Sequence, residues 1–284
     1  MCDTESDEVP LFIKKNINRK VLTDYYISND IENNQSDFKY NVFIRLNAKK
    51  IKFTNISFEH CIFDNCYFNN CVFDSCDFTG CKFIASNLQN TSFNGCKFRY
   101  STFERTQLDD DILSSEAPNE ENLKIKFARS LRMNYQQIGN AKAVNKAISL
   151  ELDTTALYFF KSWNSKEKYY KEKYPGFLNG FIQFLKWVEF WILDFVWGNG
   201  ESILKLLRSI LIIIILISIY ITNTSSIDLN IGFYLSSISV ACEIFLGIHH
   251  LENFNHWFLI IITSLRFICI ALLTALLVKR FSRR

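Results

Sequence analysis

Catalytic and nucleic-acid-binding signatures are missing from this chain of 284 residues, which also has only 3 prolines and 9 glycines. It contains no phosphate-binding glycine loop and neither an HExxH nor a GxSxG motif, so we expect no enzyme activity. A formal net charge of +3 is too small to predict nucleic-acid binding. No cysteines have CxxC spacing, and the sequence predicts no metal centre and no cofactor. The polar N-terminal segment, residues 1–36, has no apolar core of signal-peptide length, and we expect it in the cytosol.

A repeat of five residues dominates the chain between Ile51 and Asp110. A helix would need apolar spacing near 3.6 and a flat strand a spacing of 2, so this period indicates a backbone that turns a corner in every unit. Each unit places one large apolar side chain inside, together with a smaller residue two positions earlier. The predicted core residues at the unit centres are Phe53, Phe58, Phe63, Phe68, Phe73, Phe78, Phe83, Leu88, Phe93, Phe98, Phe103 and Leu108.

Units such as CIFDN, CVFDS and CKFRY resemble the pentapeptide-repeat family, whose fold is a right-handed four-sided β-helix. The resemblance implies four units per coil and about three coils, spaced like neighbouring strands. The end coils of a solenoid need covers. Phe38 and Phe43 lie in the same frame upstream, so we expect an N-terminal cap and a repeat domain over residues 37–112.

Six of the nine cysteines occupy the inward slot of the repeat. Cys61 and Cys81, or Cys76 and Cys96, would lie one coil apart on the same side, a separation that permits a disulfide geometrically. A cytosolic compartment keeps such thiols reduced. We therefore interpret these cysteines as buried structural thiols.

Helices are predicted after the repeat and a linker at residues 113–120. Residues 121–174 read as a cytosolic helical hairpin, with helices from about Glu121 to Ile138 and from about Ala141 to Trp163. Its last part, residues 164–174, is rich in lysine and tyrosine, which fits either a solvated surface or contact with anionic lipid headgroups. Residues 175–202 are crowded with aromatic residues and predict an interfacial helix on the cytosolic membrane face. Packing on the hairpin as ordinary core is the alternative.

Two apolar segments, residues 203–222 and 257–278, are long enough to cross a bilayer of about 30 Å. Residues 223–256 between them contain no lysine or arginine, whereas basic residues flank both segments and form the tail 279–284. The positive-inside rule then predicts a multi-pass protein of the inner (plasma) membrane, with the solenoid and both termini in the cytosol. The fold class is thus mixed: a four-sided β-helix, a helical hairpin and a two-helix transmembrane domain.

A third apolar segment, residues 231–246, is too short to cross and is typical of a re-entrant or pore-helix-like element. Its sequence FYLSSISV resembles the pore helix of two-transmembrane ion-channel domains, and WGNGE at Trp197–Glu201 resembles the junction before the first span. The resemblance implies a homo-oligomer around one axis. Only Gly247 stands where a potassium filter would need several glycines, so potassium selectivity is not predicted.

The polar residues of this region are the candidate sites. Glu243 either forms a carboxylate ring that attracts cations or is a solvated or salt-paired loop residue. Arg266, inside the second span, either faces the pore or a neighbouring helix, with Glu243 as a candidate partner, or snorkels. Further ion-pathway candidates are Ser236, Ser237 and Ser239, and weak candidates for metal binding or proton sensing are His249, His250 and His256.

Two functions follow from this organisation. The first is an oligomeric channel-like pore for ion transport, with the cytosolic solenoid as a sensor or assembly platform. The alternative is a nonconducting membrane-anchored scaffold that binds a protein partner through the solenoid. Mimicry of DNA by the solenoid is not expected, because outward basic residues offset the acidic ones.

Overall fold

The computed structural model describes residues 19–32, 38–224, 231–248 and 255–282. The chain divides into two compact units, Met1–Tyr158 and Phe159–Arg284. Each unit has its own core of buried apolar side chains.

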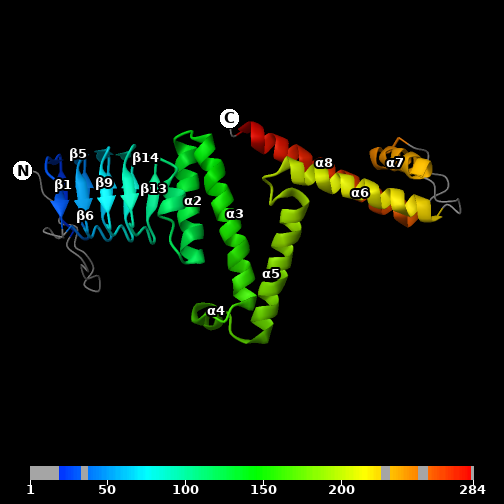
Figure 1. Ribbon diagram of the computed structural model, residues 1–284, viewed down its shortest axis with the longest axis horizontal. Helices are drawn as coiled ribbons and strands as arrows, with labels where there is room; N and C mark the ends of the chain where they lie inside the picture. Colours follow the sequence, from blue (N-terminus) through cyan, green and yellow to red (C-terminus); the bar gives the residue numbers. More distant parts are fainter. Residues whose placement is uncertain (1–18, 33–37, 225–230, 249–254, 283–284) are drawn as a thin grey trace, which may run out of the picture. The chain divides into compact units, whose positions relative to one another are not determined.

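The first unit is a parallel β-solenoid of about four turns, followed by helices (Figure 1). Its strands form three parallel sheets, in the orders β1-β4-β7-β10-β13, β14-β11-β8-β5-β2 and β12-β9-β6-β3. A fourth side is joined by the bridges from Ser57 to Asp77 and from Asp77 to Lys97. Paired residues lie one coil apart, as in Val42 with Ile62, so four five-residue units make one turn and the predicted architecture is confirmed. The strands are β1 (Val21–Thr23), β2 (Tyr26–Ile27), β3 (Ile31–Glu32), β4 (Val42–Ile44), β5 (Asn47–Lys49), β6 (Lys52–Thr54), β7 (Ile62–Asp64), β8 (Tyr67–Asn69), β9 (Val72–Asp74), β10 (Lys82–Ile84), β11 (Asn87–Leu88), β12 (Ser92–Asn94), β13 (Thr102–Glu104) and β14 (Gln107–Leu108).

The predicted core of the solenoid is confirmed, because all twelve unit centres are buried. Their rings stack from coil to coil: the centroids of Phe43 and Phe63 lie 5.1 Å apart, and those of Phe63 and Phe83 lie 4.9 Å apart. Neighbouring corners meet edge to face, as Phe73 and Phe78 do at 5.2 Å. Both arrangements are favourable for aromatic pairs.

The inward slot holds hydrogen-bond donors and not simply small residues. The thiol of Cys81 donates to the carbonyl of Phe58 in the previous coil at 2.8 Å, and the hydroxyl of Ser86 donates to the carbonyl of Phe63 at 3.2 Å. Burial raises the pKa of the Cys66 thiol to about 11. The eight cysteines that the structure describes are all free, which agrees with buried structural thiols.

The solenoid starts earlier than the sequence analysis expects. Strands β1 to β3 lie inside the segment 1–36, which was expected to stand outside the repeat, and they pair in parallel with the next coil. Val21 pairs with Val42, and Ile31 pairs with Phe53, so this first coil is one or two residues longer than the regular turn. The additional residues break the five-residue frame and hide the coil from a search for that period.

Helices cover the C-terminal end of the solenoid. Helix α1 (Ile112–Ser115) begins at the last residue of the predicted repeat domain and continues into the predicted linker. The buried Glu116 also lies in this linker, and its Oε2 accepts the N–H of Cys96 at 2.6 Å. Helix α2 (Glu121–Gln137) lies on the last coil, and helix α3 (Ala141–Asn164) follows it. These bounds agree with the predicted hairpin helices to within a residue, although α2 serves as a cap as well as a hairpin arm.

Asn134 anchors the cap to the last coil. Its side chain is fully buried, and its amide both accepts the N–H of Thr106 and donates to the carbonyl of Thr106, each at 2.7 Å. About one turn before and one turn after Asn134, Ser130 accepts the N–H of Phe103 at 2.9 Å and Gln137 accepts the N–H of Arg105 at 2.8 Å. Side chains of α2 thereby satisfy backbone groups that the next coil would otherwise pair.

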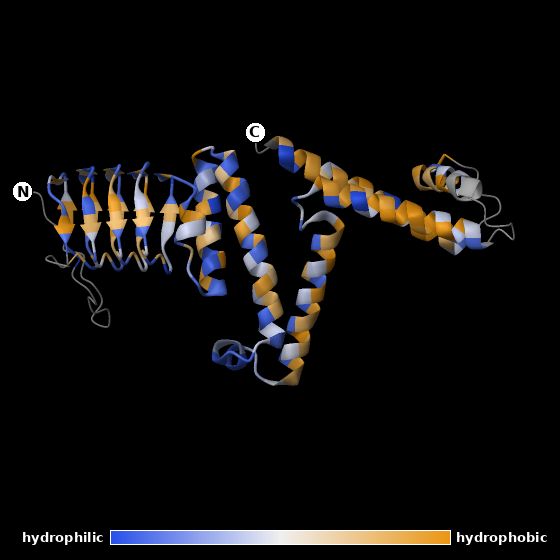
Figure 2. Cartoon of the chain, viewed as in Figure 1, coloured by the Kyte–Doolittle hydropathy of each residue, from blue (hydrophilic) through white to orange (hydrophobic). Residues whose placement is uncertain are grey.

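The second unit is helical, with α4 (Lys168–Lys173), α5 (Gly176–Trp197), α6 (Ile203–Thr224), α7 (Ile231–Leu246) and α8 (His256–Ser282) after the end of α3. Within the described residues, two helices are long and apolar enough to cross a membrane, over Ile203–Asn223 and His256–Phe281 (Figure 2). Most of their side chains are not buried inside the unit. Both match the predicted spans, and α7 coincides with the short segment predicted at residues 231–246.

Helix α5 combines the two interpretations of the aromatic segment. On one side Phe184 meets Trp163 of α3 with ring centroids 5.2 Å apart, so part of the helix is ordinary packing. Other large apolar residues of α5 are exposed, with Phe177 at 86% and Leu178 at 76% in its first turn. An apolar surface of this kind fits a membrane interface.

Candidate membrane site

The turn between α5 and α6 is a polar junction built on an unusual backbone. Gly198, Asn199 and Gly200 all have positive φ angles, of 66°, 51° and 82°. Glycine adopts this region without steric cost and asparagine tolerates it, which explains the WGNGE sequence at this point. The N–H of Gly198 donates to the carbonyl of Asp194 at 2.9 Å and closes the end of α5.

Basic side chains bind this junction from two helices. Nζ of Lys205, in the first turn of α6, donates to both carboxylate oxygens of Asp194 at 2.8 and 2.7 Å. Nζ of Lys279, near the end of α8, donates to the carbonyl of Gly200 at 2.9 Å and lies 2.5 Å from Oε1 of Glu201. The beginning of α6 and the end of α8 therefore lie together. If both helices cross a membrane, these two ends are on the same side of it.

The faces of α7 divide the predicted serines and Glu243 into two groups. Ala241, Ile244 and Phe245 are buried in the core that α7 shares with α6 and α8, and the buried Ser237 is one turn before Ala241 on the same face. At 100° per residue, Ser236, Ser239 and Glu243 occupy the opposite face. Ser236 and Ser239 are exposed in the single chain, and Glu243 is half-buried. We call Ser236, Ser239 and Glu243 the polar stripe of α7.

Arg266 of α8 lies against the C-terminal end of α7. Gly247 has a φ of 78°, its N–H donates to the carbonyl of Ile244 at 3.1 Å, and the N–H of Ile248 donates to the carbonyl of Glu243 at 2.9 Å. These bonds form the glycine cap typical of a helix end. A Cβ atom on Gly247 would lie 3.0 Å from Cζ of Arg266 and would overlap its Nη1. The guanidinium thus occupies the carbonyl end of α7, where the helix dipole favours a positive charge.

The structure does not bring the remaining candidate residues together into a site. In the part of the chain that the structure describes, Arg266 is not seen in an ion pair with its candidate partner Glu243. Its guanidinium lies against the end of α7, which agrees with the alternative that Arg266 faces a neighbouring helix. His249 and His250 lie outside the described residues, and His256 is the exposed first residue of α8. Among the side chains that the structure describes, no group of His, Cys, Asp and Glu is arranged to hold a metal ion.

Sequence reasoning missed two features of this site. The bond from Lys279 to the WGNGE turn joins residues that are far apart in the chain, and the contact between Arg266 and Gly247 depends on how α7 packs on α8. The only sequence signal for the second contact is a lone glycine directly after an apolar helix, which indicates a helix cap but not what packs against it.

Comparison with known proteins concerns the solenoid alone. The model of one family, described as the SV2A/B/C luminal domain, matches residues 11–103, which is less than half of the chain and excludes the membrane helices. No curated protein matches the chain. The repeat part of the chain is therefore similar to a luminal domain, and the matching family is not a channel family. The parallel solenoid that the structure shows fits a pentapeptide repeat.

Proposed function

We propose that this chain is a membrane-anchored solenoid protein whose C-terminal helices assemble, as several copies, into a channel-like pore. The polar stripe of α7 carries the proposal. Two hydroxyls and a carboxylate share the face of α7 opposite to its packed face. Polar side chains inside a membrane are common where they line an ion pathway, and a ring of subunits would bring the polar stripes of several copies around one water-filled axis.

The charges of the site favour cations over anions in this pore. Copies of Glu243 around the axis would form a carboxylate ring, which attracts cations. The positive charge of Arg266 lies against the carbonyl end of α7, where it offsets the helix dipole. The solenoid acts in this proposal as a sensor or as the platform on which the subunits assemble.

We assign the solenoid to the cytosol on the basis of the charge distribution. Lys205, Arg208, Lys279 and Arg280 flank α6 and α8 at the ends that meet in the junction, and such residues concentrate on the cytosolic side. The luminal family that resembles the solenoid favours the opposite side. An impermeant maleimide applied to intact cells distinguishes the two, using an exposed cysteine introduced by Lys97→Cys in a background with Cys2, Cys242 and Cys269 replaced by alanine. Labelling without lysis would overturn our orientation.

Planar bilayer recordings test conduction. The purified full chain should carry a cation-selective current, and Glu243→Gln should lower the cation-to-anion permeability ratio several-fold, because it removes the charge of the ring. The control is Glu189→Gln, which removes an exposed carboxylate of α5 outside the polar stripe.

Absence of current above protein-free membranes would reject the pore. If the protein also proved monomeric in detergent, the nonconducting scaffold with a protein partner on the solenoid would replace it. A current that Glu243→Gln and Glu189→Gln leave equally selective would reject the role of the polar stripe.

A further inference from the structure

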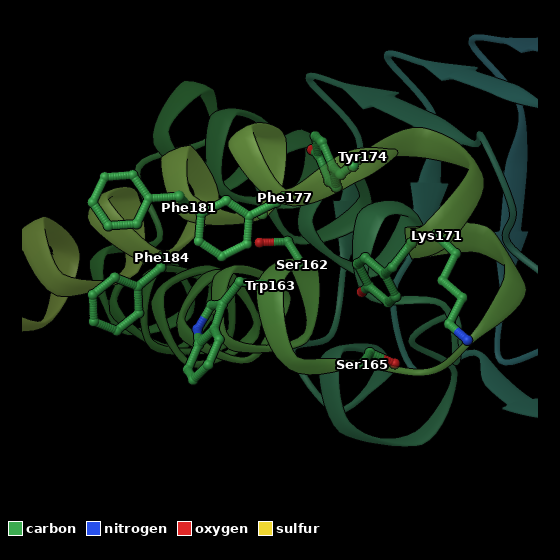
Figure 3. A pocket seen from close by; sticks show the side chains of 11 residues that line it. Ser162, Trp163, Ser165, Lys171, Tyr174, Phe177, Phe181 and Phe184 are labelled. Carbon is green, nitrogen blue, oxygen red and sulfur yellow. The ribbon is translucent and has the colours of Figure 1, made fainter.

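The second unit contains a pocket between the end of α3, helix α4 and the start of α5 (Figure 3). Its volume is about 400 Å³, which is within the range of ligand sites. In Figure 3 the rings of Phe181 and Phe184 lie at one end, and Lys171 and Ser165 lie at the other. The pocket therefore has an aromatic end and a polar end.

The aromatic end is open to the surroundings. Phe181 is 49% exposed, and its ring centroid lies 6.4 Å from that of Phe184, which also packs on Trp163. Phe177, next to this group, is almost fully exposed. Several exposed aromatic side chains close together on one helix indicate a surface that binds an apolar partner.

The polar end carries positive charge. The segment from Lys161 to Tyr174 contains five lysines and two glutamates. Both glutamates are neutralised locally, Glu167 by Lys161 at 3.1 Å and Glu172 by Lys168 at 3.7 Å. In the described part of the chain Lys171 forms no ion pair, and it lines the pocket.

Ser165 supplies a second polar group beside Lys171. Its hydroxyl oxygen accepts the N–H of Glu167 at 3.1 Å, and its own O–H can donate to an anionic oxygen. A lysine and a serine together offer charge-assisted and neutral hydrogen bonds to a phosphate.

We propose that this pocket binds one anionic phospholipid of the bilayer, with the phosphate at Lys171 and Ser165 and an acyl chain against Phe181 and Phe184. A soluble phosphate compound would leave the aromatic end uncovered, and a zwitterionic lipid would lack the net charge that the lysines favour. Helix α5 leads directly through the WGNGE turn into α6, so its exposed apolar side belongs at a membrane surface. This inference requires membrane attachment of the chain but not conduction.

Native mass spectrometry of the full chain in detergent tests the proposal, with dioleoyl phosphatidylglycerol, dioleoyl phosphatidylcholine and glycerol 3-phosphate as probes. The wild type should retain one phosphatidylglycerol per chain and bind it more tightly than either other probe. Lys171→Gln should weaken this binding about five- to tenfold. Phe181→Ser should weaken it as well, whereas Lys166→Gln, which removes an exposed lysine outside the pocket, should change it less than twofold.

Three results would overturn the proposal. Equal loss in Lys171→Gln and Lys166→Gln would mean that only the surface potential attracts the lipid. Equal binding of phosphatidylcholine would remove the role of charge, and displacement of the lipid by glycerol 3-phosphate at the same concentration would remove the role of the acyl chain. Size-exclusion profiles matching the wild type verify that each variant is folded, and since no current is measured, failure here is separate from failure of the pore.

Discussion

Replacing Asn134 by alanine should unfold the C-terminal end of the solenoid at much lower denaturant concentration. The side chain is fully buried and makes two hydrogen bonds of 2.7 Å, one to the N–H and one to the carbonyl of Thr106. Thr106 is itself fully buried, so Asn134→Ala leaves two backbone groups without partners. Each such group costs about 1–3 kcal/mol, so the free energy of unfolding should fall by about 2–6 kcal/mol. Water that enters the vacated space moves the loss towards the lower value.

The solenoid thiols report this change directly. In a background with Cys2, Cys242 and Cys269 replaced by alanine, the remaining six cysteines are buried and free, and they react with a maleimide only when their coil opens. A pulse of maleimide across a urea series should show a midpoint lowered by about 1–3 M in Asn134→Ala, given the usual dependence on urea. The control is Gln136→Ala, which changes an exposed residue of the same helix and should cost less than about 0.5 kcal/mol.

The order of labelling adds a second criterion. Coils of a solenoid contact only their neighbours, so loss of the cap should open the C-terminal coils first. Cys96 should therefore be modified at lower urea concentration than Cys61. A midpoint in Asn134→Ala equal to that of Gln136→Ala, or labelling of Cys61 before Cys96, would refute the conclusion that the amide of Asn134 holds the cap.

Three further predictions concern a buried thiol and the membrane unit. Burial raises the pKa of Cys66 to about 11, so its contribution to folding is complete below the unfolded value of about 8.5 and is lost as the pH rises towards 11. Circular dichroism melts between these pH limits should show that Cys66→Ser removes about 1.4 kcal/mol per pH unit of the stability loss, whereas the share of other buried thiols such as Cys71 and Cys81 remains. Gly247→Ala should destabilise the chain in detergent, because alanine is strained at this positive φ and its Cβ would overlap Arg266. In an Arg266→Ala background only the backbone cost of about 1 kcal/mol should remain, and an additive double-mutant cycle would contradict the contact. Lys279→Met should lower the melting temperature in detergent by about 2–4 °C, because it breaks the bond to the WGNGE turn, and an equal effect of Arg280→Met would show that only the net charge matters.

The elements that the sequence predicted well have strong local signals. The helix end at Gln137 falls next to Gly139 and Asn140, which break the helix, and the membrane helices follow from long apolar segments. The solenoid core follows from a period that only a turning backbone explains. In each case the information lies within a few residues of the structure that it specifies.

The features that the sequence did not predict depend on contacts between distant segments. The coil at Val21–Glu32 departs from the five-residue frame and is recognisable only from its pairing with the next coil. The capping role of Asn134 needs the position of α2 on the last coil, because an asparagine inside a helix has no such meaning by itself. For the same reason the sequence leaves open whether Arg266 faces the pore, faces a neighbouring helix or snorkels, whereas the structure shows its guanidinium against the end of α7.

The position of Arg266 also determines which group can attract ions in the proposed pore. A helix that ends inside a membrane presents partial negative charge at its carbonyl end, and that end would favour a cation. In this chain the guanidinium of Arg266 already lies there, so the end of α7 contributes little to the attraction of a passing cation. What remains on α7 is the polar stripe, in which Glu243 is the only charged group. In the proposed pore, the attraction of cations that α7 supplies therefore comes from this carboxylate and not from the helix dipole. Removing its charge should lower the cation-to-anion permeability ratio several-fold without disturbing the cap at Gly247, which is made by backbone atoms.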